Sequence, residues 1–235
     1  VEANQTTTLT LPFEEVEHRT SGQVQQKAVR ITTEDTVSVF VVNFRSFTAD
    51  GTKVLPIQSL GDSYRIISYP GETSQDFSST ILVVATADQT QVEVTPTAET
   101  VDGQQAGQPF TLTLDRGESY QIEALGSGDL SGTTVAGTDS SGACRPFAVF
   151  SGATAFVQCN FGDLLFEQNF PTNTWGREFF SVPFFFADQY TLRVMAHQDN
   201  TRFNFGQEPL SDGFVLDAGE FLEFNDLEAG RRIHA

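Results

Sequence analysis

The chain alternates short apolar runs with polar turn residues, and almost no segment shows the 3.6-residue period of an amphipathic helix. The runs are rich in β-branched and aromatic residues and are bounded by Gly, Asp, Asn, Ser or Pro. They include VSVFVVNF (37–44), YRIISYP (64–70), ILVVATA (81–87), FTLTL (110–114) and FAVFSG (147–152). Many short strands joined by turns are typical of a sandwich or barrel, so the pattern predicts an all-β, jelly-roll-like antiparallel fold with few or no helices.

Much of this pattern occurs twice. The copies are ILVVATADQTQVEV (81–94) with TLRVMAHQDNTRFNF (191–205), FTLTLDRGESYQIEAL (110–125) with FVLDAGEFLEFNDL (214–227), and VLPIQSLGDSYRIISYP (54–70) with LLFEQNFPTNTWGREFFSVPF (164–184). Related strands also recur in VSVFVVN (37–43) and RPFAVFSG (145–152). A repeat of about a hundred residues has enough material for its own small core. We therefore expect two tandem β-sandwich units packed together, residues 1–113 and 114–235, the second including the start of a third repeat.

The repeated corners carry the residues that tight turns require. An Asp at such a corner can accept backbone N–H bonds in an Asx-turn, and a Thr suits the entry to the return strand. A Gly-Glu pair marks the turn inside the second repeated segment. The turn residues predicted in this way are Asp88, Thr90, Gly117, Trp175, Gly176, Asp199, Thr201 and Gly219.

The charge of the chain narrows the class of partner. The 31 acidic residues outnumber the 13 basic residues, and the net charge is −18. Such a field repels nucleic-acid phosphates and anionic membrane surfaces, so we expect neither as a partner. No stretch approaches the roughly 20 apolar residues of a membrane helix, so we expect no membrane insertion.

The two cysteines, Cys144 and Cys159, flank RPFAVFSGATAFVQ, which is a predicted hairpin. This arrangement favours a disulfide over a metal site, because a metal site needs more ligands. Closing a loop of this size would stabilise the fold by roughly 3 kcal/mol in the chain-entropy model. The alternative is a pair of buried free thiols.

Motifs for catalysis are not found. GDSY (61–64) resembles the start of a hydrolase motif, but it enters a strand and no Asp-x-x-His follows to activate Ser63. The histidines show neither H-E-x-x-H nor H-x-H spacing for zinc. We therefore expect a non-catalytic protein without a cofactor other than calcium. Asp50 and Asp163 occupy comparable repeat positions and are the residues where a calcium site is predicted, the alternative being turn-forming acids on a solvated face.

The segment REFFSVPFFFADQY (177–190) has five Phe within eight residues. They cannot all face one core, because side chains alternate between the two faces of a strand. Either the neighbouring repeat covers the second face, or some rings are exposed and form a contact site for a protein or glycan. Under the second interpretation the binding residues are Phe184, Phe185 and Phe186.

The order of these blocks resembles the IgG Fc-binding protein N-terminal domain family, and the resemblance covers nearly the whole chain. Its most specific parts are Trp175-Gly176 and the two A-x-x-D-x-T corners at 85–90 and 196–201. Members of that family occur in secreted mucin-like proteins and in large bacterial cell-surface proteins. The resemblance implies an extracellular, cell-surface binding or adhesion module whose partners are proteins, glycans or other copies of the same protein.

Two hypotheses for the function follow. A recognition module would bind a protein or glycan through exposed parts of a rigid β scaffold. A structural spacer or filament segment of a long surface protein would have no ligand of its own.

Overall fold

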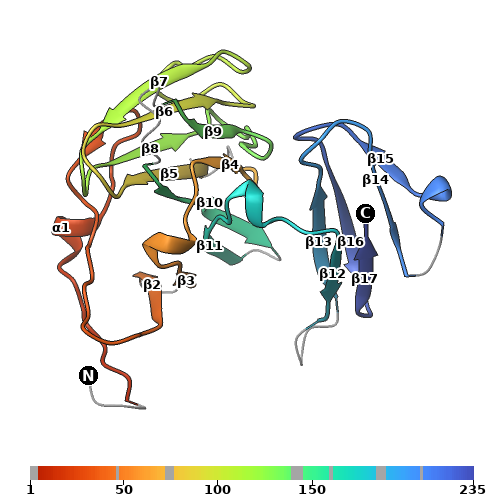
Figure 1. Ribbon diagram of the computed structural model, residues 1–235, viewed down its shortest axis with the longest axis horizontal. Coiled ribbons are helices and arrows are strands. Elements are labelled where there is room, and N and C mark those ends of the chain that lie inside the picture. Colours follow the sequence, from red (N-terminus) through yellow and green to blue (C-terminus); the bar gives the residue numbers. More distant parts are fainter. Residues whose placement is uncertain are drawn as a thin grey trace.

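The structure is a computed structural model that describes residues 5–45, 48–71, 77–138, 145–158, 161–183, 189–206 and 209–235. These ranges contain the strands β1 to β17, one short α-helix (α1, Phe13–Val16) and 3-10 turns. The predicted all-β class with few helices is confirmed. Figure 1 shows that the strands gather into a larger unit and a smaller unit, with the C-terminus in the smaller one.

The larger unit has two antiparallel sheets. One has the order β1-β8-β5-β10-β11, with β1 at Val24–Gln25, β8 at Ser119–Glu123, β5 at Ser79–Ala85, β10 at Phe147–Gln158 and β11 at Phe161–Gln168. The other has the order β4-β9-β6-β7, with β4 at Ser63–Arg65, β9 at Thr134–Gly137, β6 at Thr90–Thr95 and β7 at Phe110–Leu114.

Both sheets of the larger unit turn one face toward a shared core. Ile81 and Val83 of β5 are fully buried there, as are Val92 and Val94 of β6, at 0% exposure. The alternation of buried and partly exposed residues along β5 is the period-2 pattern that the sequence predicts for a strand with one buried face. Phe147 of β10 is also fully buried in this core, so the later part of the chain helps to close it.

The smaller unit repeats most of this arrangement. One sheet has the order β12-β17-β14-β15, with β12 at Glu178–Ser181, β17 at Arg231–His234, β14 at Thr201–Phe205 and β15 at Phe214–Leu216. The other described sheet pairs β13 (Tyr190–Met195) with β16 (Phe221–Leu227). Phe203, Phe205 and Phe224 pack together in the core between these sheets, and the more exposed Phe214 packs at its margin, with ring centroids 4.9 to 6.2 Å apart.

A separate hairpin of β2 (Val39–Arg45) and β3 (Thr48–Val54) lies beside the larger unit, below it in Figure 1. In the sequence this hairpin precedes β4, just as the hairpin β10–β11 precedes β12. The order β4-β9-β6-β7 matches β12-β17-β14-β15, and the pair β5–β8 matches β13–β16. The registers agree as well: Tyr64 pairs with Val135 as Phe179 pairs with Ile233. The two segments that are similar in sequence are therefore similar in strand pairing.

The sheets do not divide the chain at residues 113 and 114, where the repeats in the sequence place a boundary. β5 pairs with β8 and with β10, and both of these strands lie beyond residue 114. The two sheets of the larger unit contain strands up to residue 168, and the strands of the smaller unit begin at residue 178. The reason is that a sequence repeat shows where similar strands recur, whereas sheet pairing across the repeat decides which strands share a core.

The predicted turn residues form the same interlocking corner in both units. Asp88 Oδ1 accepts the N–H of Arg116 at 3.0 Å, and Asp199 Oδ1 accepts the N–H of Ala218 at 3.0 Å. Each Asp thus binds the neighbouring Gly-Glu turn, rather than the local backbone of an Asx-turn. Gly117 is in the left-handed region at φ 82°, which favours glycine because it has no Cβ. The two turn motifs of each repeat therefore contact one another across the sandwich end.

The two threonines of these corners have matching bonds. Thr90 Oγ1 donates to the carbonyl of Ala87 at 2.7 Å, and Thr201 Oγ1 donates to the carbonyl of Gln198 at 2.7 Å. The N–H of Gly219 donates to the carbonyl of Ala196 at 2.9 Å. The threonine of the A-x-x-D-x-T motif thus bonds within its own corner, and the alanine of the motif accepts a bond from the Gly-Glu turn.

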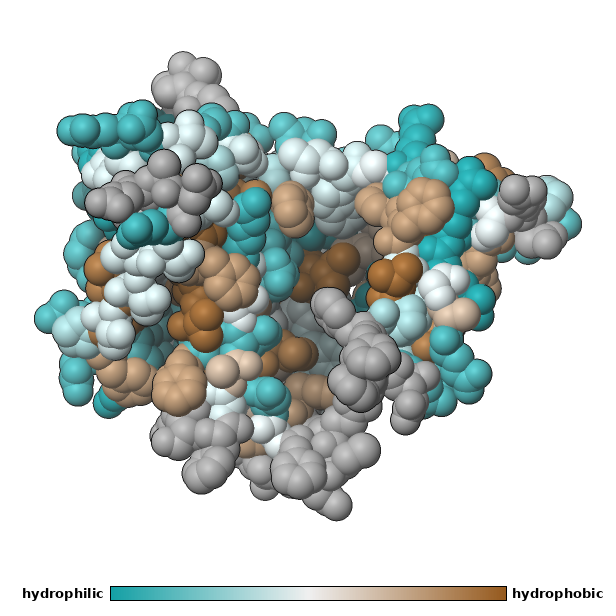
Figure 2. All heavy atoms as spheres, turned by 90° about the horizontal axis from the view of Figure 1, so that it is seen from below, coloured by the Kyte–Doolittle hydropathy of each residue, from teal (hydrophilic) through white to brown (hydrophobic). Residues whose placement is uncertain are grey.

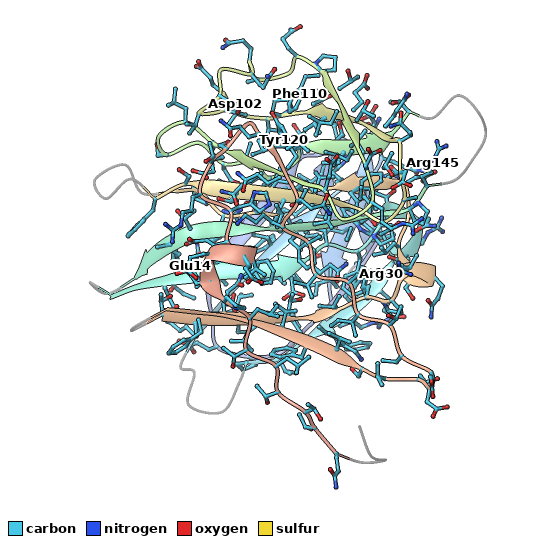
Figure 3. All side chains as sticks on the ribbon, turned by 90° about the vertical axis from the view of Figure 1, so that its left-hand side faces the viewer. Glu14, Arg30, Asp102, Phe110, Tyr120 and Arg145 are labelled. Atoms are coloured by element: carbon cyan, nitrogen blue, oxygen red, sulfur yellow. The ribbon has the colours of Figure 1, made fainter. Side chains whose placement is uncertain are left out.

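The N-terminal segment covers one side of the larger unit and places a histidine against β8. Figure 3 shows this side, with Glu14 and Arg30 on the segment and Tyr120 on the sheet behind it. His18 Nε2 lies 2.7 Å from the hydroxyl of Ser119, while its Nδ1 is buried without a hydrogen-bond partner among the described residues. Burial lowers the pKa of His18, and the positive charge of Lys27 lowers it further.

The pKa shift predicts a pH-dependent stability. A histidine whose pKa is lowered on folding stabilises the protein above its unfolded pKa of about 6.5, and this contribution is lost as the pH falls through the folded pKa. We expect the free energy of unfolding, measured by urea denaturation, to fall more steeply in the wild type than in His18→Gln between about pH 7.5 and about pH 5.5. Equal slopes for the two proteins would contradict the role given to His18.

Candidate interaction surfaces

Several of the predicted site residues lie outside the described residues. These are Cys144, Cys159, Phe184, Phe185 and Phe186. The disulfide, and the contact site at the three phenylalanines, therefore stay predictions. Among the described residues, no group of three or more His, Cys, Asp or Glu side chains is arranged to hold a metal ion.

Asp50 and Asp163 help to hold the hairpin β2–β3 against β11. Asp50 Oδ2 accepts the N–H of Phe166 at 2.8 Å, and Asp163 Oδ1 accepts the N–H of Ala49 at 3.2 Å. The hydroxyl of Thr48 also donates to Asp163. Both carboxylates thus have structural partners across the two hairpins. A calcium ion at these acids stays a prediction, which melting temperatures measured with EDTA and with added calcium test.

Trp175 and Gly176 lie at the entry to β12. The indole Nε1 of Trp175 donates to the carbonyl of Phe170 at 3.3 Å, and its ring meets His197 edge-on with the centroids 6.0 Å apart. His197 belongs to the A-x-x-D-x-T corner of the smaller unit. The two most specific parts of the sequence pattern therefore touch each other in space.

Arg193 on β13 joins the two units. Its Nη1 donates to Asp129 at 2.9 Å and to the carbonyl of Ser68 at 2.7 Å, and both of these residues belong to the larger unit. Its Nε donates to Glu223 of the neighbouring strand β16 at 2.7 Å. The Arg193 side chain is only 11% exposed, so these contacts are largely shielded from water.

Two aromatic rings enclose the same guanidinium group. Its central carbon lies 4.3 Å from the ring centroid of Tyr69 and 4.7 Å from that of Phe221, which is the geometry of cation–π contacts. Burial raises the pKa of Tyr69, and the negative charge of Glu223 raises it further. Planar stacking and forked donation both require arginine, because the ammonium group of lysine provides neither.

This junction is not predicted from the sequence. One of the two interpretations of 177–190 places a contact between the repeats at its phenylalanines, and it stays a prediction because 184–188 lie outside the described residues. The described contact at Arg193 is polar. The available signal was a charged residue in the middle of an apolar strand, TLRVM (191–195). Its partners Asp129 and Glu223 lie on other strands and loops and could not be assigned from spacing.

Exposed apolar residues occur on several elements, and those of β2 and β12 include some of the most exposed. Phe40 and Phe44 of β2 are 64% and 78% exposed, and Phe180 and Val182, at the end of β12, are 75% and 78% exposed. Figure 2 shows the molecule from below, where hydrophobic atoms are visible on both units around a hollow. Contiguous apolar exposure of this kind marks contact surfaces.

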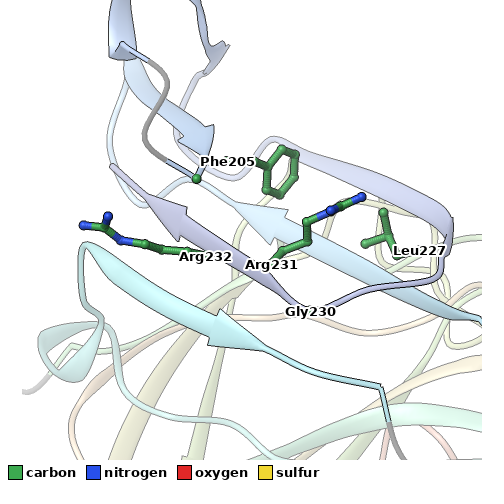
Figure 4. A pocket seen from close by; sticks show the side chains of 6 residues that line it. Phe205, Leu227, Gly230, Arg231 and Arg232 are labelled. Atoms are coloured by element: carbon green, nitrogen blue, oxygen red, sulfur yellow. The ribbon is translucent and has the colours of Figure 1, made fainter.

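A shallow, open hollow of about 480 Å³ lies at one end of the smaller unit (Figure 4). It is lined by Phe205, Gly206, Leu227, Gly230, Arg231 and Arg232. In the larger unit the loop between β8 and β9 sends the fully buried Leu130 into the core, whereas the loop between β16 and β17 spans only 228–230. Among the described residues, this shorter loop brings no counterpart of Leu130 into the smaller core.

The strands and turns together define an all-β protein built from several antiparallel sheets. The model of the IgGFc binding protein family matches residues 50–231, so the chain belongs to that family and the predicted resemblance is confirmed. The chain is also 30% identical over 210 residues to the human IgGFc-binding protein, which covers 86% of this chain and 4% of the relative. It therefore spans a small part of that protein's length. No solved structure matches the chain.

This family is defined by binding and is not a known class of enzyme. None of the helices in the described ranges is long and apolar enough to cross a bilayer.

The junction at Arg193 leads to a prediction of stability. In Arg193→Met, Asp129 and Glu223 lose their shared cation while they remain 22% and 25% exposed. We expect a loss of about 3 kcal/mol in the free energy of unfolding, because breaking a buried ion pair leaves uncompensated charge. Chemical denaturation measures this loss.

The matched control is Arg232→Met. Arg232 also bonds a glutamate, Glu178, through its Nε at 2.6 Å, but this pair is 39% and 50% exposed. Exposed pairs contribute at most about 1 kcal/mol, so the control should change stability little. If Arg193→Met costs no more than Arg232→Met, then Arg193 does not have the joining role given to it.

Proposed function

We propose that the chain is an extracellular, cell-surface binding and adhesion module that contacts proteins and performs no catalysis. Membership of the IgGFc-binding protein family supports a protein partner. So does the name of the human relative, although that name describes a protein of which this chain covers 4%. The strongly acidic composition, with a net charge of −18, disfavours nucleic acid as the ligand.

The observation that carries the proposal is an exposed surface strip at β12, formed by Phe180, Val182 and Arg232, which we call the aromatic strip. Phe180 is 75% exposed and lies directly opposite Arg232 in the pairing of β12 with β17. Val182 follows at 78% exposure. Aromatic residues and arginine are enriched in the energetically dominant part of protein interfaces, because they bury a large area and retain polar bonding.

The strands that carry the strip are held by their pairing within the sheet. β17 pairs with both β12 and β14, and Ile233 of β17 is buried in the smaller core. Exposed side chains on a braced sheet lose little conformational freedom on binding, which favours affinity. A glycan is the second class of ligand that such a surface could contact, and a glycan array distinguishes it from a protein.

A structural spacer is the alternative function. The junction at Arg193, which fixes one unit against the other, favours it. A spacer would show no ligand on arrays of extracellular proteins or glycans. The recognition module would show a specific partner, and the first probe is the purified IgG Fc fragment because of the name of the human relative.

The aromatic strip leads to a prediction of binding. Against a partner found on an array of extracellular proteins, we expect Phe180→Ser to weaken the affinity at least about tenfold in surface plasmon resonance, because it removes about 1.5 kcal/mol or more of apolar burial. The melting temperature should not fall, since the ring is exposed in the free protein.

The control for this prediction is Val101→Ser. Val101 is an exposed apolar residue of the larger unit, at 54% exposure, and does not belong to the strip. Its substitution should leave the affinity unchanged. Equal affinities for the wild type and Phe180→Ser would exclude the strip as the contact surface, and the absence of any partner would favour the spacer.

A further inference from the structure

We propose that residues 128–132, which we call the junction loop, couple the two units. The contact of Arg193 with this loop keeps Leu130 in the core of the larger unit, and separation of the units releases it. The loop lies between β8 and β9 of the larger unit, whereas Arg193 lies on β13 of the smaller unit. This coupling between units goes beyond the recognition of another protein at the aromatic strip.

The side chain of Leu130 fills part of the larger core. It is fully buried, at 0% exposure, and belongs to the same cluster of buried residues as Ile66 and Ile81. Its N–H donates to the buried hydroxyl of Ser79 at 3.1 Å. The core of the larger unit is therefore complete only while the junction loop holds Leu130 in this position.

The residues on either side of Leu130 contact the smaller unit. Nη1 of Arg193 donates to Oδ2 of Asp129 at 2.9 Å and to the hydroxyl of Ser131 at 3.0 Å. Leu130 thus lies between two residues that are bonded to the same guanidinium group. A movement of Arg193 away from the loop removes a partner from both neighbours of Leu130.

Side-chain bonds, rather than pairing in a strand, give the junction loop its shape. The hydroxyl of Ser131 accepts the N–H of Ser68 and donates to the carbonyl of Ser68, both at 3.0 Å. The same carbonyl accepts a bond from Arg193 at 2.7 Å. The bonds that shape the loop and the bonds that join the units therefore share two atoms, Ser131 Oγ and the Ser68 carbonyl oxygen. The strength of such a network is not the sum of separate pairs.

The backbones of the two units also meet at this loop. A Cβ atom added at Gly132 would lie 2.7 Å from the carbonyl oxygen of Gly219, at the corner of the smaller unit. On its other side, the N–H of Gly132 donates to the carbonyl of Ile66 in the larger unit at 2.8 Å. The smaller unit therefore lies directly against the end of the loop that follows Leu130 and limits an outward movement there.

The charge of Asp129 gives the reason why the loop opens when the units separate. The side chains of Asp129 and Glu223 are 22% and 25% exposed, and Arg193 is their shared cation. Without this cation each carboxylate needs water instead, because a partly buried charge without a partner is costly. Asp129 reaches more water when the loop turns outward, and this movement withdraws the adjacent Leu130 from the core.

The coupling acts in both directions. A partner that separates the units favours the open loop, and a partner that binds the open loop favours separation, because a coupling free energy between two sites is reciprocal. Binding at the smaller unit would in this way change the stability of the larger unit.

Hydrogen exchange measured by mass spectrometry tests the coupling in Arg193→Met. We expect the amides of the junction loop to exchange at least about tenfold faster than in the wild type, because the loop opens more often. The amides of β6, whose Val92 and Val94 lie in the same core, should exchange as in the wild type. Unchanged exchange in the loop overturns the proposal. An equal increase in β6 also overturns it, since the larger unit would then open as a whole.

The matched control is Arg232→Met. It makes the same substitution in the smaller unit, at the more exposed ion pair with Glu178. Exchange in the junction loop should equal that of the wild type. An increase as large as that of Arg193→Met would show that any lost arginine of the smaller unit loosens the loop, and it would overturn the role of Arg193.

A second variant, Asp129→Asn, changes the loop side of the contact. The side chain keeps an oxygen for the N–H of Ser131, which Oδ1 accepts at 2.8 Å, but it loses the charge that Arg193 binds. We expect exchange in the junction loop again to rise at least about tenfold. The double variant with Arg193→Met should exchange no faster than the faster single variant, because both substitutions break one contact. Increases that multiply in the double variant would show two separate effects and overturn the coupling.

Discussion

The pairing of β10 with β5 is the interaction on which the larger unit depends. It places Phe147 and Val149 against strands that lie much earlier in the chain, and it completes a core that those strands leave open. Because the hairpin that closes this core lies after β9, the repeat visible in the sequence does not coincide with the larger unit. The two sheets of that unit contain β1 and β4 through β11, and the closing hairpin comes from the later of the two repeated segments.

The same pairing explains a difference in burial between matching residues. Tyr64 of β4 is 1% exposed, because its ring lies 5.2 Å from that of Phe147 of β10 and its hydroxyl donates to the carbonyl of Phe147. Phe179 holds the matching position in β12 and is 50% exposed. The repeated sequence pattern therefore does not by itself determine how deeply a residue is buried.

The two units are joined through polar contacts. Arg193 contacts two carboxylates, a backbone carbonyl and two aromatic rings, so this part of the junction depends on the precise geometry of several polar partners. A junction of this kind suits both functions proposed for this member of the IgGFc-binding protein family. In a recognition module it would position Phe180 of β12, and in a spacer it would fix the orientation of one unit against the next.

The sequence by itself determined the all-β class, the repeated order of strands and the residues of the turns. Each of these is local. The alternation in ILVVA (81–85) shows one buried face, and Gly117 is needed at a single position where φ is positive. Only the tertiary structure decided that β5 pairs with β10, that Asp88 binds the turn at Arg116, and that Arg193 reaches Asp129. The physical reason is that the period of a strand specifies which face is buried, whereas its hydrogen-bonding edge is the same backbone in every strand. The choice of neighbour therefore depends on the packing of distant segments.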